Sequence, residues 1–290
     1  SAYQSSNGNR AGRVYLIPGT AFEQTESMGV MESGALAWDG ETPEDRLGQQ
    51  TGRLGDIDGD GLDDFVMSAM RNQENGVGPA GDEFRGSGKT YVILGADVAS
   101  MEPGSIGSVA DAAAAWVGEN GGDAIGYSGG TIGDFDGDGL PDMTVGSHGY
   151  SSQGSQNGKI YIVTAQDVAE GGTRSLSEAS YGFVGEGEYD WAGKGASGAG
   201  DFDRDGRADL LIGAMGHSTD DVEFAGRAYL VLSASMLPGT HEVGDADYIF
   251  SGERAWDGAG AATLGPGDLN GDGLPDLLIG AWQGDSHETA

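Results

Sequence analysis

Four acidic loops of nearly identical sequence carry the clearest chemistry in this 290-residue chain. Each loop follows the pattern D-x-[DN]-x-D-G-x-x-D, with side-chain oxygens at positions 1, 3, 5 and 9 and a glycine at position 6. Alternate side chains of a tight loop converge, and Ca²⁺ takes roughly 6–8 oxygen ligands in a flexible shell. The loops cover residues 56–64, 134–142, 201–209 and 268–276. The pattern therefore predicts four calcium sites, one in each loop.

The predicted ligands are the four side chains of each loop and the backbone carbonyl of position 7. They are Asp56, Asp58, Asp60, Leu62 and Asp64; Asp134, Asp136, Asp138, Leu140 and Asp142; Asp201, Asp203, Asp205, Arg207 and Asp209; and Asp268, Asn270, Asp272, Leu274 and Asp276. Position 9 can bind through both carboxylate oxygens. The glycine at position 6 is expected to adopt a positive φ. Mg²⁺ fits less well because it keeps its waters, and the loops lack the His and Cys of transition-metal sites. An acidic turn without an ion is the alternative.

The residues that follow each loop exclude an EF-hand. An EF-hand loop has about 12 residues and ends in Glu, whereas position 12 here is Met67, Val145, Ile212 or Ile279. These residues lie in apolar runs such as DLLIGA, which are typical of β-strands. The chain therefore leaves each loop as a strand and not as a helix.

The loops belong to a longer repeat. Their first aspartates are separated by 78, 67 and 67 residues. An apolar strand follows each loop, and a strand of the type G-[KR]-x-Y follows three of them. Each unit also contains an aromatic residue and a D-x-x-G element. The aromatic residues are Trp38, Trp116, Phe183 and Phe250, and the elements are Asp45–Gly48, Asp123–Gly126, Asp190–Gly193 and Asp257–Gly260. Four short strands per unit predict the blades of an all-β β-propeller.

The repeat predicts one propeller domain over residues 1–290, made of four-stranded antiparallel blades. The blades are residues 48–118, 126–185, 193–251, and 260–282 completed by 12–38. Strands rich in Gly, Ala and Ser precede each acidic loop, and they are expected to crowd around a central axis. The repeated aromatic residues are expected to pack between blades.

The chain resembles the FG-GAP repeat family, to which the propeller of integrin α subunits belongs. The D-x-x-G element, the acidic loop, the DLLIGA strand and the G-[KR]-x-Y strand carry this resemblance over essentially the whole chain. In that family the acidic loop joins the first and second strands of a blade and binds Ca²⁺, which the resemblance implies for all four loops. Two features depart from the family: the glycine of D-x-x-G follows Leu47, Ile125, Ala192 or Ala259 where the family usually has Phe, and there are four repeats where the integrin type has seven blades.

The ends of the chain predict how the ring closes. The chain starts with third and fourth strands, RVYLIP and GALAWDG, and ends after a second strand, DLLIGAW. Pairing these halves would complete the fourth blade and remove two exposed sheet edges. Two alternatives remain: the chain is a piece of a longer propeller, as a start at Ser1 without Met suggests, or two chains exchange half-blades. The expected state is thus a monomer or a half-blade-exchanged dimer.

The composition of the chain excludes several classes of function. The formal charge is −33, and four Ca²⁺, adding eight positive charges, would still leave −25. A chain this acidic is not expected to bind nucleic acid or an anionic membrane, and no apolar segment is long enough for direct membrane insertion. Weak calcium sites need extracellular calcium, so we expect a secreted or cell-surface protein. The absence of Cys in such a protein favours a bacterial source.

The chain shows no catalytic motif such as HExxH, G-x-S-x-G or a P-loop, so we expect a binding protein and not an enzyme. The first interpretation is an adhesion or recognition module, and its resemblance to integrins places a protein or glycan ligand on the loop face opposite the calcium loops. Candidate contacts are Tyr150, Trp191, Trp256, Trp282 and the long loop 71–86. The alternatives are a lectin-like or accessory module of a polysaccharide-degrading enzyme, and a structural spacer.

Overall fold

The computed structural model describes residues 4–5, 8–19, 34–76, 86–152, 155–219 and 221–283. These residues form short strands joined by turns, and the α-helices among them are α1 (Gly95–Ala99) and α2 (Ala165–Ala169). The predicted all-β class is confirmed. None of the described helices is long and apolar enough to cross a membrane.

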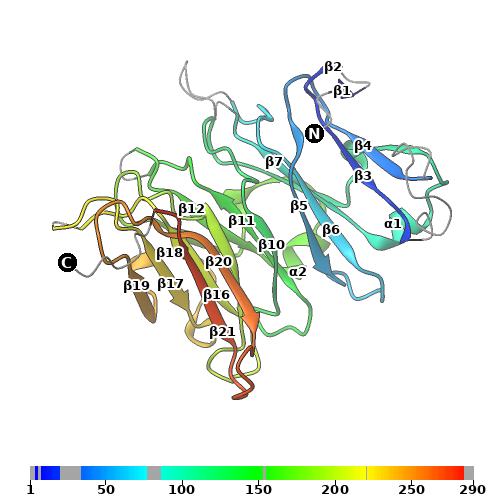
Figure 1. The fold of residues 1–290 in the computed structure, drawn as a ribbon. Helices are drawn as coiled ribbons and strands as arrows, with labels where there is room; N and C mark the ends of the chain where they lie inside the picture. The colour runs from blue at the N-terminus through cyan, green and yellow to red at the C-terminus, as the bar shows by residue number, and fades with distance from the viewer. Residues whose placement is uncertain are drawn as a thin grey trace.

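Three complete units each contain four antiparallel strands that are neighbours in one sheet. Unit 1 consists of β5 (Leu47–Gly55), β6 (Asp64–Ala69), β7 (Lys89–Ile93) and β9 (Ala114–Val117); unit 2 of β10 (Gly129–Gly133), β11 (Asp142–Ser147), β12 (Lys159–Val163) and β14 (Tyr181–Val184); and unit 3 of β15 (Gly195–Gly200), β16 (Asp209–Ala214), β17 (Arg227–Val231) and β19 (Tyr248–Ser251). The units stand side by side in chain order (Figure 1).

Two half-units flank this array. The amino-terminal half-unit pairs β3 (Arg13–Leu16) with β4 (Leu36–Asp39), after a short hairpin of β1 (Gln4–Ser5) and β2 (Gly8–Asn9). The carboxyl-terminal half-unit pairs β20 (Ala259–Gly267) with β21 (Asp276–Ala281). The two half-units belong to separate sheets at opposite ends of the array (Figure 1).

The predicted pairing of the two half-units is not formed among the described residues, where β3 and β4 belong to one sheet and β20 and β21 to another. In Figure 1 the sheets fan out without completing a turn, so β21 stays far from β3. Part of the segment assigned to the fourth blade, residues 20–33, lies outside the described residues.

Each complete unit also contains a fifth strand, which pairs with the unit before it. The sequence did not predict this strand. The connection between the third and fourth strands of a unit adds a parallel strand to the outer edge of the preceding unit. These strands are β8 (Ile106–Ser108) on β4, β13 (Gly172–Ser175) on β9 and β18 (Gly239–Glu242) on β14. Among the described residues β19 has no such partner. In the part of the chain that the structure describes, no strand covers the outer edge of unit 3.

The first strands of successive units lie against one another, which explains their small side chains. β5 contacts β10, β10 contacts β15, and β15 contacts β20. A Cβ atom added to Gly265 would lie 2.4 Å from the carbonyl oxygen of Gly198, and one added to Gly198 would lie 2.7 Å from that of Ile132. Only glycine allows backbones to approach this closely.

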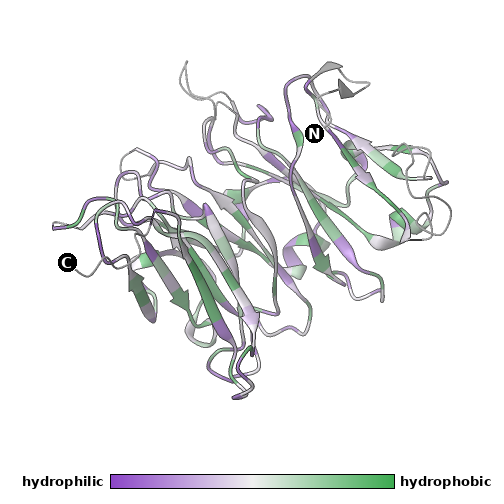
Figure 2. Ribbon diagram, in the orientation of Figure 1, coloured by the Kyte–Doolittle hydropathy of each residue, from purple (hydrophilic) through white to green (hydrophobic). Residues whose placement is uncertain are grey.

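The hydrophobic core lies between neighbouring units, as the repeated aromatic residues predicted. Trp38, Trp116 and Phe183 are buried in three successive cores. Figure 2 shows hydrophobic residues concentrated along the strands and hydrophilic residues in the connecting loops. The fourth aromatic residue contradicts the prediction, because Phe250 is 40% exposed. It lies on β19, whose outer edge carries no fifth strand.

Candidate metal centres

The four acidic loops occupy equivalent places in the fold. Each joins the first strand of a unit to the second: β5 to β6, β10 to β11, β15 to β16, and β20 to β21. All four second strands begin at the aspartate of position 9, so the chain leaves each loop as a strand, as predicted. The loops therefore lie at the same end of successive units.

Three of the loops bring carboxylates together. The aspartates at positions 1, 3 and 9 each offer an oxygen, and these oxygens lie within 4.8 Å of one another. The three groups are Asp56, Asp58 and Asp64; Asp134, Asp136 and Asp142; and Asp201, Asp203 and Asp209. The predicted ligands at position 5 (Asp60, Asp138 and Asp205) do not belong to these groups. Three carboxylates at this spacing form a set of hard oxygen donors that suits Ca²⁺.

Hydrogen bonds to the backbone hold each loop in shape. In the first loop the amide of Gly61 donates to Asp56 (2.9 Å), that of Asp60 to Asp58 (3.1 Å) and that of Leu62 to Asp60 (2.8 Å). The other three loops repeat these bonds. The glycines at position 6 have φ between 83° and 96°, which confirms the predicted turn. Each carboxylate that accepts one bond retains further lone pairs for a cation.

The aspartate at position 9 links its loop to the rest of its unit. Asp209 accepts hydrogen bonds from the amide of Phe202, within the loop (2.7 Å), and from that of Ser233, just beyond the third strand (2.9 Å). Asp64 and Asp142 make the same pair of bonds. Both oxygens are thus in use, so a cation bound through both of them would have to share these oxygens with the backbone.

Burial makes these carboxylates costly to ionise without a positive partner. It raises the pKa of Asp142 to about 7, and it also raises the pKa values of Asp64, Asp136 and Asp209. Desolvation disfavours the charged form of a carboxyl group, and the neighbouring aspartates reinforce the effect. A divalent cation would offset both causes, so the residues present fit a bound metal ion.

The fourth loop differs from the others. Asn270 replaces an aspartate, and no group of three carboxylates forms there among the described residues. Asp276 accepts a bond from the amide of Leu269 (2.7 Å), but its second oxygen faces the side chain of Asn270 (3.4 Å) where the other loops have an amide from beyond the third strand. Backbone hydrogen bonds, above all that from Gly273, lower the pKa of Asp268. This loop joins β20 to β21, which form a two-stranded sheet among the described residues.

A polar cavity lies at the opposite end of the units. It has a volume of about 410 Å³, and its lining includes Arg46, Tyr127, Trp191 and Lys194. The ammonium of Lys194 lies 5.8 Å from the ring centre of Tyr127 and 5.7 Å from that of Trp191. Sequence reasoning missed both cations, although Lys194 directly follows the glycine of a D-x-x-G element.

Three of the predicted aromatic contacts gather beside this cavity. Trp191, Trp256 and Trp282 line a smaller hollow of about 170 Å³ with Phe224 and Met215. Phe224 stacks on Trp256 (4.6 Å between ring centres) and on Trp191 (6.3 Å). The fourth predicted aromatic, Tyr150, lies elsewhere, against the ammonium of Lys159 (4.9 Å). Much of the predicted contact loop, residues 77–85, lies outside the described residues.

Comparison with known proteins confirms the repeat. The FG-GAP repeat model matches residues 126–163, 195–231 and 260–289, so the chain contains FG-GAP repeats. The chain is also 29% identical over 175 residues to integrin alpha-PS2 of Drosophila melanogaster. That similarity covers 57% of this chain and 12% of the integrin, so the chain corresponds to a small part of that protein.

Proposed function

We propose that the chain is an extracellular recognition module whose units are propeller blades stiffened by Ca²⁺. The observation that carries this proposal is the recurrence of the same three-carboxylate group in units 1, 2 and 3, at the same end of each. A cation there bridges the loop to the start of the second strand. Because metal binding to the folded state stabilises that state, calcium acts as part of the fold.

The same proposal places the ligand on the face opposite the acidic loops. The polar cavity around Arg46 and Lys194 provides positive charge on a chain of net charge −33. Positive groups beside aromatic rings suit an acidic side chain of a protein partner. Similarity to a segment of an integrin α chain supports a role in adhesion at the cell surface. The lack of Cys favours a bacterial source.

Thermal unfolding followed by circular dichroism tests the calcium proposal, with Ca²⁺, Mg²⁺ or EGTA present. We expect Ca²⁺ to raise the melting temperature more than Mg²⁺ does. The triple variant Asp58→Asn, Asp136→Asn and Asp203→Asn should lose this response. Asp63→Asn is the matched control, because Asp63 is an exposed neighbour outside the carboxylate groups that pairs with Arg53. A melting temperature that EGTA leaves unchanged would contradict structural calcium.

The aromatic hollow supports a second candidate function, the binding of glycans. Trp256 and Trp282 are 52% and 65% exposed, and exposed aromatic rings provide flat surfaces for sugar rings. Binding to a glycan array that Trp256→Ala abolishes, and that Leu237→Ala at another exposed apolar position leaves intact, would favour this function. Equal binding by the two variants would argue against it.

A further inference from the structure

We infer that the polar cavity at the end of the units opposite the acidic loops binds the carboxylate-bearing sugar of an acidic glycan. This inference rests on the second candidate function above, the binding of glycans, and narrows it to glycans that contain a uronic acid. The cavity has a volume of about 410 Å³. Its described lining residues come from units 1, 2 and 3 and from the loops that lead into them.

The cavity gathers equivalent positions of three successive units. The residue that follows the glycine of the D-x-x-G element is Gln49 in unit 1, Tyr127 in unit 2 and Lys194 in unit 3, and all three line the cavity. They converge because they lie at the starts of first strands, and β5 lies against β10 as β10 does against β15. The backbone at this place is repeated, so the three different side chains determine what the cavity binds.

The position after the aspartate of each D-x-x-G element has a left-handed backbone. The angle φ is 58° at Arg46, 49° at Ala124, 51° at Trp191 and 65° at Gly258. Glycine adopts such a φ without steric cost, whereas a larger residue is strained. Because Ala124 and Gly258 serve the fold at this position, the fold does not need a large side chain there. Arg46 and Trp191 both line the cavity, and residues held under such strain are concentrated at ligand sites.

The two cations of the cavity lack the carboxylate partners that other cations of this chain have. Lys159, for example, pairs with Glu119 at 2.7 Å. Among the described residues, neither Arg46 nor Lys194 forms an ion pair, although both are half-buried. None of the described lining residues is Asp or Glu, in a chain with 47 acidic and 14 basic residues. The positive charge of the cavity is therefore available to a ligand.

The donors of these two cations suit a carboxylate. The Nε atom of Arg46 is buried and has no hydrogen-bond partner among the described residues. A buried donor without a partner is unfavourable, and the planar guanidinium matches the two oxygens of a carboxylate. The ammonium of Lys194, held 5.8 Å from the ring centre of Tyr127 and 5.7 Å from that of Trp191, supplies a second charge. A bound carboxylate would satisfy both groups.

The rest of the cavity suits a sugar ring attached to that carboxylate. Its volume falls within the range of small-molecule sites. The Nε1 atom of Trp191 donates to Oε1 of Gln156 (2.9 Å), which fixes the indole and leaves the amide nitrogen of Gln156 as a donor for a hydroxyl group. Trp191 also lines the adjoining aromatic hollow, where it stacks on Phe224. A chain of sugars can thus run from the cavity into the hollow, whereas an acidic peptide side chain would not use the amides.

A glycan array is the first test. It should carry oligosaccharides of galacturonate, glucuronate and mannuronate, the methyl esters of the same compounds, sulfated oligosaccharides and neutral ones. We expect binding to at least one uronic acid, and binding to its methyl ester at least about tenfold weaker, because the ester lacks the charge. Equal binding to neutral or esterified sugars would keep the glycan function and overturn this inference, as would a preference for sulfate. Binding to none of them would overturn both.

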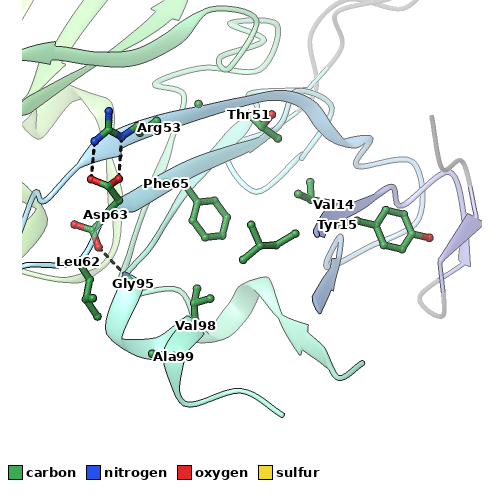
Figure 3. A pocket seen from close by; sticks show the side chains of 13 residues that line it. Val14, Tyr15, Thr51, Arg53, Leu62, Asp63, Phe65, Gly95, Val98 and Ala99 are labelled. Carbon is green, nitrogen blue, oxygen red and sulfur yellow. Dashed lines mark hydrogen bonds and ion pairs between the residues drawn. The ribbon is translucent and has the colours of Figure 1, made fainter. Parts of the chain in front are cut away.

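Variants of the two cations test the site itself by calorimetry with the uronic-acid oligosaccharide that binds best. Arg46→Gln and Lys194→Gln should each weaken binding about tenfold or more. Arg46→Lys should restore only part of the affinity, because an ammonium lacks the planar fork. Arg53→Gln is the control: it removes the same charge beside an acidic loop, where Arg53 pairs with the exposed Asp63 (2.8 Å; Figure 3), and should leave the affinity unchanged. Equal affinities for the three Gln variants would overturn the inference.

Melting temperatures measured by circular dichroism show whether these variants are folded. We expect wild-type values, because the replaced cations form no ion pair. If Arg46→Gln is destabilised, Arg46→Gly takes its place, since Gly258 occupies the equivalent position with a φ of 65°. It should lose affinity to the same extent. Wild-type affinity in Arg46→Gly would overturn the assignment of the carboxylate to Arg46.

Competition separates a sugar from a protein partner. A tetraglutamate peptide carries carboxylates without sugar rings, and we expect it to displace the uronic-acid oligosaccharide at concentrations at least about tenfold higher than the free oligosaccharide requires. Equal or better competition by the peptide would overturn the inference and favour the acidic side chain of a protein partner in this cavity.

Discussion

The hexapeptide DLLIGA occurs twice in this molecule and meets two different environments. As β16 it lies between β15 and β17, and its leucines are fully buried. As β21 it has one partner strand, and Leu278 is 50% exposed. The strand conformation is the same in both places, and an acidic loop of the same general pattern precedes each strand. The comparison shows that the sequence sets the local structure, whereas neighbouring units decide how much stability that structure contributes.

The largest difference between β16 and β21 should appear in the free energy of unfolding when equivalent leucines are replaced by alanine. Leu211→Ala removes a fully buried side chain and should lower the free energy of unfolding by about 2–5 kcal/mol. Leu278→Ala should lower it by less than about 1 kcal/mol, because the side chain is half exposed. Urea unfolding of both variants measures the difference. Equal losses would show that β21 is buried in the single chain.

A buried aspartate between units 1 and 2 should make the stability of the protein depend on pH. Burial raises the pKa of Asp123, in the D-x-x-G element between units 1 and 2, to about 6. An unfolded aspartate titrates near ~3.9. The folded state therefore keeps this proton to higher pH than the unfolded state does. The free energy of unfolding should fall as pH rises from about 4 to about 6, by about 3 kcal/mol from this group.

Asp123→Asn removes this ionisation and should flatten that part of the profile. Urea unfolding at pH 4, 5, 6 and 7 gives the difference between variant and wild type, in which the contributions of other groups cancel. Asp111→Asn serves as the control, because Asp111 is exposed. Parallel profiles for Asp123→Asn and the wild type would show that the buried carboxyl group does not titrate in this range.

Replacing the turn glycine should lower thermal stability equally in the loop before β16 and in the loop before β21. Gly206 and Gly273 occupy position 6 of the loops before β16 and β21, with φ of 96° and 83°. Replacing either with Ala imposes the local cost of a positive φ on a residue with a Cβ, about 1–2 kcal/mol. We expect the same loss of thermal stability in both variants, measured without added metal. A much larger loss for Gly206→Ala would mean that neighbouring units also constrain this turn.

The sequence predicted those features that depend on a few adjacent residues. The glycines of the acidic loops, the strands that begin at position 9 and the pattern of four strands per unit all follow from local spacing. The small residues of β5, β10, β15 and β20 correctly predicted close packing, because the repeat placed them at the same point of each unit. The predicted FG-GAP repeats are confirmed for the same reason.

Other features could not be read from spacing. The fifth strands β8, β13 and β18 pair across units, and their short polar sequences resemble loops. Phe250 is exposed although its counterparts are buried, because among the described residues β19 is an edge strand that no further strand covers. Position 9 of the acidic loops was predicted only as a ligand, yet Asp64, Asp142 and Asp209 also bind an amide from beyond the third strand.

The sequence by itself determined the repeat, the turn at each acidic loop and the supply of oxygen donors, because backbone sterics and strand periodicity act over a few residues. The tertiary structure alone decided which carboxylates meet, which leucines are buried and which strands of different units pair. Those outcomes depend on contacts between residues that are far apart in the chain. The two copies of DLLIGA differ in burial because β16 lies between two strands, whereas β21 has one partner strand among the described residues.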